Sequence, residues 1–300
     1  SPDGCFSNVA PRLAGVADEG APGWGDAGVL VPWHLYRVYG DERFLERNLD
    51  AMCAWVDFVH RHNPDLVWRH RVGPHFADWL APTPTPREVV ATAYFARSTE
   101  LTARAAGVLG RDDLADRYGT LAGHIRKTFA ERFVTPGGRI AGDTQTAYLL
   151  ALAFELLPGG NGGEVASRAA ERLAELVEAA GPGVTTGFLG VGLIAPVLDA
   201  CGRPDLAHAL LRRTDPPSWL FPLRHGATTI WERWDGYTDE RGFQAAAMNS
   251  FNHYALGSIG EWLYQGVAGL AQAPGSTGYR ELLIRPRPGD LAWARATYTS

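Results

Sequence analysis

Lysine is almost absent from this sequence of 300 residues. Of its 28 lysine and arginine residues, Lys127 is the one lysine, and the formal net charge is -5. No basic run or basic helical face occurs, which argues against nucleic acid and anionic membrane surfaces as partners. No apolar run reaches the roughly 18 residues needed to cross a bilayer. We therefore expect no nucleic-acid partner and no membrane partner.

Cysteine is scarce as well. Cys5, Cys53 and Cys201 are odd in number and far apart in the sequence. They predict neither a disulfide framework nor a paired-cysteine metal site, so buried or idle thiols are the favoured interpretation. Cysteine usage therefore does not decide whether the protein is cytoplasmic or secreted.

The common motifs of metal, nucleotide and serine catalysis are missing. The sequence has no HExxH, no Walker A motif, no GxGxxG after a strand and no serine in a GxSxG elbow. Its nine histidines show no metal-ligand spacing. The sequence therefore predicts no metal and no organic cofactor.

Tryptophan, by contrast, is abundant. Half of the ten tryptophans stand directly beside charged residues, as in Asp78-Trp79 and in Trp231-Glu232-Arg233-Trp234-Asp235. An indole has a flat apolar face and a donor N–H, which suits the face of a sugar ring. The alternative is that these residues are core tryptophans at helix ends, and the sequence leaves both interpretations open.

Apolar residues recur at helical spacing through most of the chain, with Gly- and Pro-rich breaks between the periodic segments. Consecutive helices with short turns form antiparallel hairpins, and no repeat of fixed period occurs, so we expect an irregular barrel of helix pairs. Two short strands are predicted at 282–286 and 291–299. We expect the chain to be truncated at both ends. The predicted helices are 29–38, 41–60, 87–109, one from 112 to about 129, 143–157, 164–180, 187–200, 204–213 and 249–270.

Two local contexts hold acidic residues that differ from a solvated surface. Asp18, Glu19 and Asp26 lie in a loop rich in glycine, and Glu232 lies between two tryptophans. The alternatives are that Asp26 is a helix N-cap with Glu19 exposed, and that Glu232 forms a structural ion pair with Arg233. A third cluster, Met248 to Tyr254, is dense in hydrogen-bonding groups that could contact sugar hydroxyls or cap a helix.

Several sequence blocks together resemble the α-L-rhamnosidases of glycoside hydrolase family 78, in family order over nearly the whole chain. The blocks are Ala21-Pro22-Gly23-Trp24-Gly25-Asp26-Ala27, Asp78-Trp79-Leu80-Ala81-Pro82, Gly142-Asp143-Thr144-Gln145-Thr146-Ala147-Tyr148, Thr185-Thr186-Gly187-Phe188-Leu189-Gly190, Pro217-Ser218-Trp219-Leu220, Gly226 to Gly236, Asn249-Ser250-Phe251-Asn252-His253-Tyr254 and Gly260-Glu261-Trp262-Leu263-Tyr264.

This resemblance implies an all-α fold, an (α/α)6 barrel. Residues 1–275 would form the barrel without its first helices, and residues 276–300 would begin a C-terminal β-sandwich domain. It implies removal of terminal α-L-rhamnose, with inversion, from a rhamnose-containing glycoside or oligosaccharide. Two rivals stay open: another (α/α) barrel carbohydrate-active enzyme, and a non-catalytic rhamnoside-binding remnant.

The resemblance also implies roles for single residues. Glu19 would be the general acid, with Asp18 as its nearest rival, and Glu232 would be the general base. The pKa of Glu19 would have to be raised, for which nearby Asp26 and Asp18 are the expected cause. In the commoner family motif an aspartate stands where this chain has Asn8. The expected substrate-binding residues are Asp18, Trp24, Asp26, Trp79, Trp231 and His253.

Overall fold

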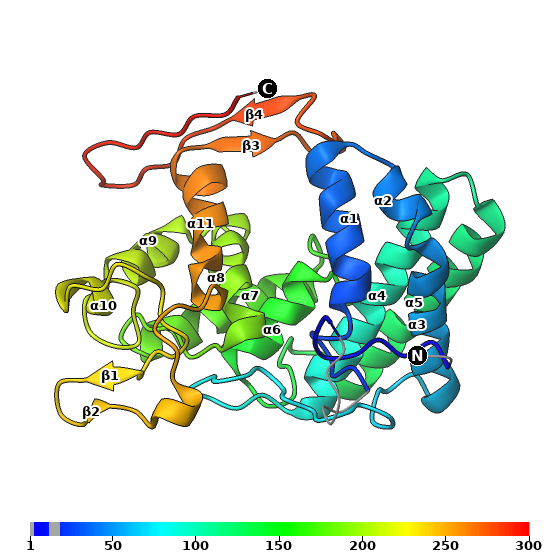
Figure 1. Cartoon of the computed structure of the whole chain (residues 1–300), viewed down its shortest axis with the longest axis horizontal. Coiled ribbons are helices and arrows are strands. Elements are labelled where there is room, and N and C mark those ends of the chain that lie inside the picture. The colour runs from blue at the N-terminus through cyan, green and yellow to red at the C-terminus, as the bar shows by residue number, and fades with distance from the viewer. Residues whose placement is uncertain (1–2, 12–18, 300) are drawn as a thin grey trace.

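A computed structural model describes residues 3–11 and 19–299 of the chain, and it is mostly helical (Figure 1). The helices are α1 Ala27–Tyr39, α2 Arg43–Glu46, α3 Leu49–His62, α4 Arg87–Val108, α5 Asp112–Phe133, α6 Gln145–Ala153, α7 Glu164–Ala179, α8 Phe188–Ala200, α9 Pro204–Arg212, α10 Leu220–Arg224 and α11 Ile259–Trp262. The short elements are β1 Tyr237–Thr238, β2 Gly242–Phe243, η1 Ala246–Met248, η2 Ala255–Ser258, the π-helical turn η3 Leu263–Val267, β3 Leu270–Gln272 and β4 Leu282–Ile284.

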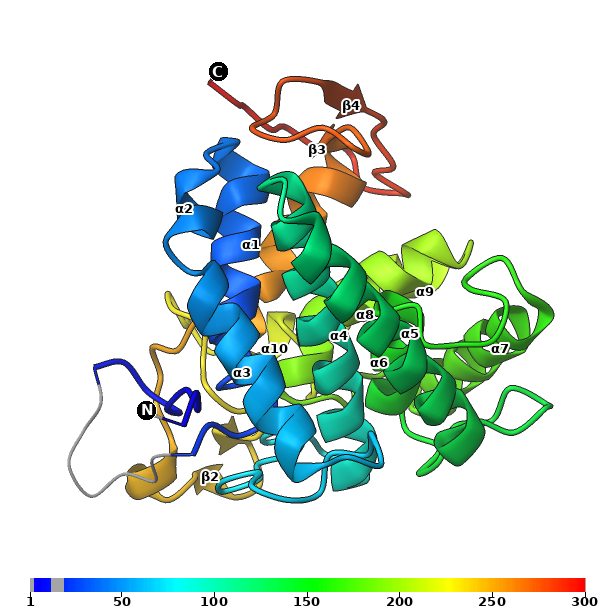
Figure 2. The ribbon, with the colours of Figure 1, turned by 90° about the vertical axis from the view of Figure 1, so that its right-hand side faces the viewer.

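The helices form two layers. Consecutive helices pack in pairs, as α4 with α5, α6 with α7 and α8 with α9, while α4 also packs on α6 and α6 on α8 (Figures 1 and 2). Helix α6 is buried on all sides from Gln145 to Leu152, whereas α7 buries a single stripe and exposes acidic residues on its other face. Burial on all sides is typical of a central helix, and a single apolar stripe of a peripheral one. The helices α4, α6 and α8 thus make the inner layer.

The predicted apolar spacing accounts for the outer helices. In α5 the buried residues Tyr118, Ile125 and Phe129 recur on one face, as the sequence predicts. The preceding helix α4 ends just before Gly110, whose φ of +65° is a left-handed conformation that favours glycine. These positions confirm the sequence prediction of a helix pair broken at Gly110.

The loops before the inner helices lie at one end of the molecule, at the bottom of Figure 1. Thr85 before α4 and Thr144 before α6 share a hydrogen bond of 2.7 Å between their hydroxyls. The loop before α4 also contacts the start of α8, where Gly187 N donates to Asp78 Oδ2. The strands β3 and β4 lie at the opposite end, where Gly278 N donates to Arg37 O near the end of α1. The loops before α4, α6 and α8, which are far apart in the sequence, therefore contact one another at the end of the molecule opposite β3 and β4.

The predicted helix 41–60 is interrupted. It divides into α2 and α3, with Arg47 and Asn48 between them. The side-chain amide of Asn48 donates to Phe44 O, the carbonyl that its backbone N–H would bond in a continuous helix. The helical spacing is correct on both sides, but this side-chain bond replaces the helical one.

The predicted long helix over 249–270 forms only in part. Residues up to 254 form a loop, followed by η2, the short α11 and the π-helical η3. The loop pairs with an earlier segment, because Glu232 N donates to Ser250 O and His253 N donates to Ile230 O, each at 2.9 Å. These long-range backbone bonds replace the helical ones.

The end of the chain contains a two-stranded sheet. The predicted strand near 282 is confirmed as β4, but its antiparallel partner is β3, which the sequence did not predict and which begins at the last residue of the predicted helix 249–270. The predicted strand 291–299 does not form in the described residues. The predicted boundary between residues 275 and 276 falls between β3 and β4, and the domain division stays a prediction. Among the described residues, no helix combines the length and apolarity that a membrane span requires.

Candidate active site

Glu19, the predicted acid, lies in the loop before α1. Asn8 donates from Nδ2 to Glu19 O at 3.1 Å and accepts at Oδ1 from Ala21 N at 2.6 Å, so one side chain holds the loop on both sides of Gly20. The Glu19 carboxylate is 33% exposed and accepts a 2.5 Å hydrogen bond from Arg71 Nε. Its ion-pair partner is thus a cation from the loop after α3.

Asp26, predicted to bind substrate, is fully buried. Its Oδ1 accepts from Trp55 Nε1 at 2.9 Å and from Ser98 Oγ at 2.6 Å, and its Oδ2 accepts from Gly23 N at 2.8 Å. Burial raises the pKa of Asp26, and the hydrogen bonds from Ser98 and Trp55 oppose that rise. It stands at the N-cap position of α1 but makes no side-chain cap bond to the helix. Both of its oxygens therefore hold the loop in place.

The two tryptophans predicted to stack on a sugar belong to one aromatic row. Phe76 lies between them, with ring centroids 4.8 Å from Trp24 and 5.4 Å from Trp79. All three side chains are half-buried. Phe76 was not predicted from the sequence, although its position two residues before Asp78-Trp79 could have indicated it as a site residue. The row therefore consists of one ring from the loop before α1 and two rings from the loop before α4.

A cavity lies beside this row. It measures about 540 Å³, and its walls include Phe76, Asp78 and Leu80 from the loop before α4, and Gly142 from the loop before α6. Asp78 is 5% exposed, and its carboxylate bonds with the start of α8. Burial raises the pKa of Asp78, and the hydrogen bond from Thr146 opposes that rise.

Glu232, the predicted base, is half-buried in the loop between α10 and β1. Its Oε2 accepts from Ser250 N at 2.8 Å, while its Oε1 makes no hydrogen bond within the described part of the chain. Arg233 bonds instead with Asp235, Nε to Oδ1 at 2.9 Å. The structure therefore shows Arg233 paired with Asp235 rather than with Glu232, and one oxygen of Glu232 is fixed while the other is open.

The flanking tryptophans of Glu232 are buried. Trp231 is 8% exposed and packs with ring centroids 5.1 Å from Phe251 and 6.5 Å from Tyr237. Trp234 donates from Nε1 to Thr186 O at 2.9 Å. Neither indole offers an open face of the kind that stacks on a sugar, and both fix the loop that positions Glu232.

His253 comes from the loop before η2. Its ring lies 4.9 Å from that of Phe188, the first residue of α8, and its Nδ1 accepts from Ala255 N at 3.3 Å. Because Nδ1 accepts, the proton of a neutral ring is on Nε2, which is then a hydrogen-bond donor.

The structure thus brings the loops of Trp24, Trp79, Glu232 and His253 to the start of α8. The carboxylates of Asp26 and Asp78 are buried. Asp18, the remaining predicted residue, lies outside the described residues. No group of three or more His, Cys, Asp or Glu side chains that could hold a metal occurs among those described.

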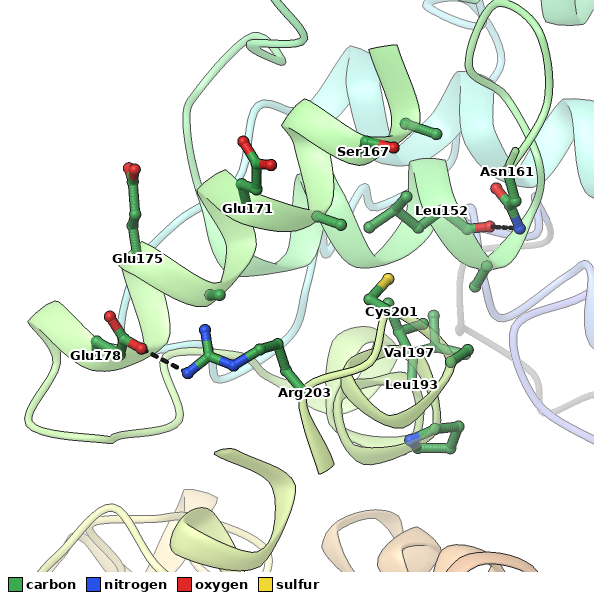
Figure 3. A pocket seen from close by; sticks show the side chains of 16 residues that line it. Leu152, Asn161, Ser167, Glu171, Glu175, Glu178, Leu193, Val197, Cys201 and Arg203 are labelled. Carbon is green, nitrogen blue, oxygen red and sulfur yellow. Dashed lines mark hydrogen bonds and ion pairs between the residues drawn. The ribbon is translucent and has the colours of Figure 1, made fainter. Parts of the chain in front are cut away.

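A larger cavity lies elsewhere. It measures about 780 Å³ and lies between α7 and α8 (Figure 3). Its floor is apolar and includes Leu152 and Val197, while Glu178 pairs with Arg203 at 2.7 Å on its edge. None of the predicted site residues lines it. Cavity size therefore does not select the predicted site residues.

Comparisons with known proteins identify the family of the chain. Residues 1–267 match the family described as bacterial alpha-L-rhamnosidase 6 hairpin glycosidase domain. Among curated relatives, an alpha-L-rhamnosidase of Streptomyces avermitilis is 45% identical over 99% of this chain, which covers 28% of that protein. One from Formosa agariphila is 40% identical over 92% of this chain, which covers 30% of it. The chain therefore spans less than a third of the length of these relatives.

Solved structures give the same result. The alpha-L-rhamnosidase of Streptomyces avermitilis, complexed with L-rhamnose, superimposes with a TM-score of 0.90 at 45% identity, over 96% of this chain and 27% of that one. The enzyme of Aspergillus terreus gives a TM-score of 0.88 at 34% identity, over 96% of this chain and 34% of the other. Since the family match covers most of the sequence, the chain belongs to the bacterial alpha-L-rhamnosidase six-hairpin glycosidase domains.

Proposed function

We propose that this protein hydrolyses terminal α-L-rhamnose from rhamnosides with inversion, and that Glu232 is the general base. The observation that carries the proposal is the state of the Glu232 carboxylate, which has one oxygen fixed by Ser250 N and the other open. A general base needs this combination, because it must be held in place and still reach a water. The Streptomyces relative solved with L-rhamnose supports the choice of sugar.

The acid in this mechanism is Glu19. It donates a proton to the leaving glycosidic oxygen, while Glu232 takes a proton from the water that attacks the anomeric carbon. Arg71 donates to Oε1 of Glu19, so the proton would reside on Oε2. Asp18 is the rival acid. Inversion requires the two carboxyl groups to stand roughly 6.5–9.5 Å apart, with the water between base and sugar.

The sugar would bind against the aromatic row of Trp24, Phe76 and Trp79, because a flat aromatic face suits the apolar side of a pyranose. His253 would donate from Nε2 to a sugar hydroxyl. Asp26 and Trp231 hold the loops and do not touch the sugar in this proposal, because their side chains are buried. This assignment replaces the substrate contacts that the sequence suggested for them.

We also propose that the two helical layers belong to an (α/α)6 barrel, with residues 1–275 in the barrel and residues 276–300 at the beginning of a β-sandwich domain. The support is the inner layer of α4, α6 and α8, with the site loops collected at one end.

The activity is tested with a chromogenic aryl α-L-rhamnoside, beside an aryl α-D-glucoside. The wild type should release the chromophore from the rhamnoside alone. Glu232→Gln should lower kcat by about 10²–10⁴-fold, the usual contribution of a general base. Glu240→Gln is the matched control, since Glu240 is exposed nearby, and it should keep full activity.

The anomeric form of the product tests the mechanism. Inversion gives β-L-rhamnose first, which NMR detects before mutarotation, whereas the α anomer first would contradict the inverting assignment. L-rhamnose binding without hydrolysis by a folded wild type would favour the non-catalytic rhamnoside-binding protein instead.

A further inference from the structure

Helix α8 begins without a cap of its own. Its N-cap residue is Gly187, which has no side chain, and the first bond of the helical ladder runs from Val191 N to Gly187 O. The N–H groups of residues 187–190 therefore have no partner within the helix. Buried N–H groups of this kind require acceptors from elsewhere.

Asp78 and Trp79 supply all of these acceptors. Asp78 Oδ2 accepts from Gly187 N at 2.7 Å, and Asp78 Oδ1 accepts from Leu189 N at 2.7 Å and Gly190 N at 3.3 Å. The carbonyl of Trp79 accepts from Phe188 N at 3.0 Å. One dipeptide more than 100 positions earlier in the chain thus caps the whole first turn of α8.

The fit between these segments is close. A side chain at position 187 would collide with the Trp79 carbonyl and stand 2.7 Å from Ala81 N, so glycine alone permits the approach. Thr146 Oγ1 of α6 donates to Asp78 Oδ2 at 2.5 Å, which fixes the carboxylate from a third element. The position of Trp79 is therefore tied to the start of α8.

The same stretch, residues 186–189, contacts the other site loops. Thr186 O accepts from Trp234 Nε1 at 2.9 Å, and Phe188 packs against His253. A side chain at Gly23, next to Trp24, would stand 2.6 Å from Leu189 Cδ2. The start of α8 is consequently in contact with loops that hold the aromatic row, the base and the histidine.

We infer that Asp78 is a positioning residue for this site: by capping α8 from the neighbouring loop, it fixes Trp79 and, through Thr186 and Trp234, the loop of Glu232. The inference rests on the proposed function for its effect on hydrolysis. It assigns Asp78 no contact with the sugar or with the reacting atoms.

An isosteric amide cannot replace this carboxylate. Both oxygens of Asp78 accept only, since each faces at least one backbone N–H. In Asp78→Asn the amide NH2 would face an N–H in either orientation, and one donor of α8 would lose its partner. Asp199→Asn is the matched control, because Asp199 is a buried aspartate at the other end of the same helix, paired with Arg287.

Steady-state kinetics on an aryl α-L-rhamnoside separate positioning from simple destabilisation. Asp78→Asn should raise KM and lower kcat, with kcat/KM reduced on the order of 100-fold, as expected when reacting groups move by about 1 Å. Trp234→Phe removes the bond to Thr186 and should lower kcat with KM unchanged, since Trp79 keeps its support. Asp199→Asn should leave both constants unchanged. Wild-type constants in Asp78→Asn, or a lower kcat with KM unchanged in that variant, would overturn the inference.

Amide hydrogen exchange tests the same link without catalysis. Asp78→Asn should exchange faster than wild type in peptides covering both 183–192 and 228–236, and Asp199→Asn in neither. Faster exchange confined to 183–192 would show that Asp78 does not reach the loop of Glu232. If the wild type has no rhamnosidase activity, the proposed function is refuted but this inference is not. The exchange rates still show whether Asp78 fixes the loop of Glu232.

Discussion

Asn8 shows how much one side chain contributes at the residue scale. Its amide donates to Glu19 O and accepts from Ala21 N, so it needs both a donor and an acceptor. An ionised aspartate could accept from Ala21 but would repel the Glu19 carbonyl. Loss of a partner by a buried backbone group costs about 1–3 kcal/mol.

We therefore predict that Asn8→Asp lowers kcat/KM at neutral pH. The ratio of variant to wild-type activity should rise as the pH falls toward about 4, because a protonated aspartic acid regains the donor. Asn8→Ala, which loses both bonds, should be impaired without this pH dependence. Since aspartate is the commoner residue in the family motif, a more active Asn8→Asp at neutral pH would contradict the role of the amide.

Single residues were predictable from the sequence only where a local motif marks them. Glu232 and Trp79 stand in distinctive aromatic and acidic contexts, and the structure puts both in loops at the start of α8. The burial of Asp26 was not predictable, because its partners Trp55 and Ser98 come from two distant helices. Spacing in the chain holds no information about such contacts.

At the element scale, Thr144 joins two inner helices. Its Oγ1 accepts from Ala147 N at 3.3 Å as the N-cap of α6 and bonds with Thr85 before α4. We predict that Thr144→Ala lowers the free energy of unfolding by about 0.5–2 kcal/mol, as expected for loss of an N-cap. Urea denaturation measures this, with Thr144→Ser and the exposed Thr120→Ala as controls. Equal stability of Thr144→Ala and wild type would show that the cap contributes nothing.

Elements that form by local spacing were predicted well, and those that depend on distant partners were not. Helices α4, α7 and α9 begin at the predicted residues, because their apolar periodicity and flanking glycine or proline are local. The segment after 249 has helical composition, yet its first residues pair with residues 230–232. Tertiary pairing overrides local propensity there.

On the scale of the whole molecule, fully buried aspartates and aspartates paired with arginine affect acid stability in opposite ways. Desolvation raises the pKa of Asp26 and of Asp78, so their contribution to stability is fully present below the unfolded value and is lost as the pH rises through the folded one. A hydrogen bond from Arg172 lowers the pKa of Asp143 to about 2. The contribution of Asp143 to the free energy of unfolding is therefore present above the pKa that this residue has in the unfolded chain, and it is lost as the pH falls toward about 2.

We accordingly predict that the free energy of unfolding falls between about pH 4 and pH 2, and that Asp143→Asn makes this fall shallower. Chemical denaturation across that range measures both slopes. Asp116→Asn is the control, because Asp116 is exposed and makes no ion pair among the described residues, and it should follow the wild type. An unchanged slope in Asp143→Asn would mean that its pairing with Arg172 does not contribute.

The layered arrangement of the whole molecule was predictable in kind, because paired amphipathic helices must bury their stripes against a central layer. Which loops meet was not predictable from periodicity. The decisive contacts, such as Asp78 with Gly187, join residues more than 100 positions apart and use glycines that the sequence pattern does not distinguish from turn glycines.

The start of α8 also has a consequence for folding in time. The loops that meet there span the chain from Gly23 to His253, so each contact closes a long stretch of chain. Contacts of high sequence separation are slow to form, whereas single helices form within about a microsecond. During refolding, helical signal should return before any rhamnoside is cleaved, and a chain halted between the two events would be fully helical and catalytically silent.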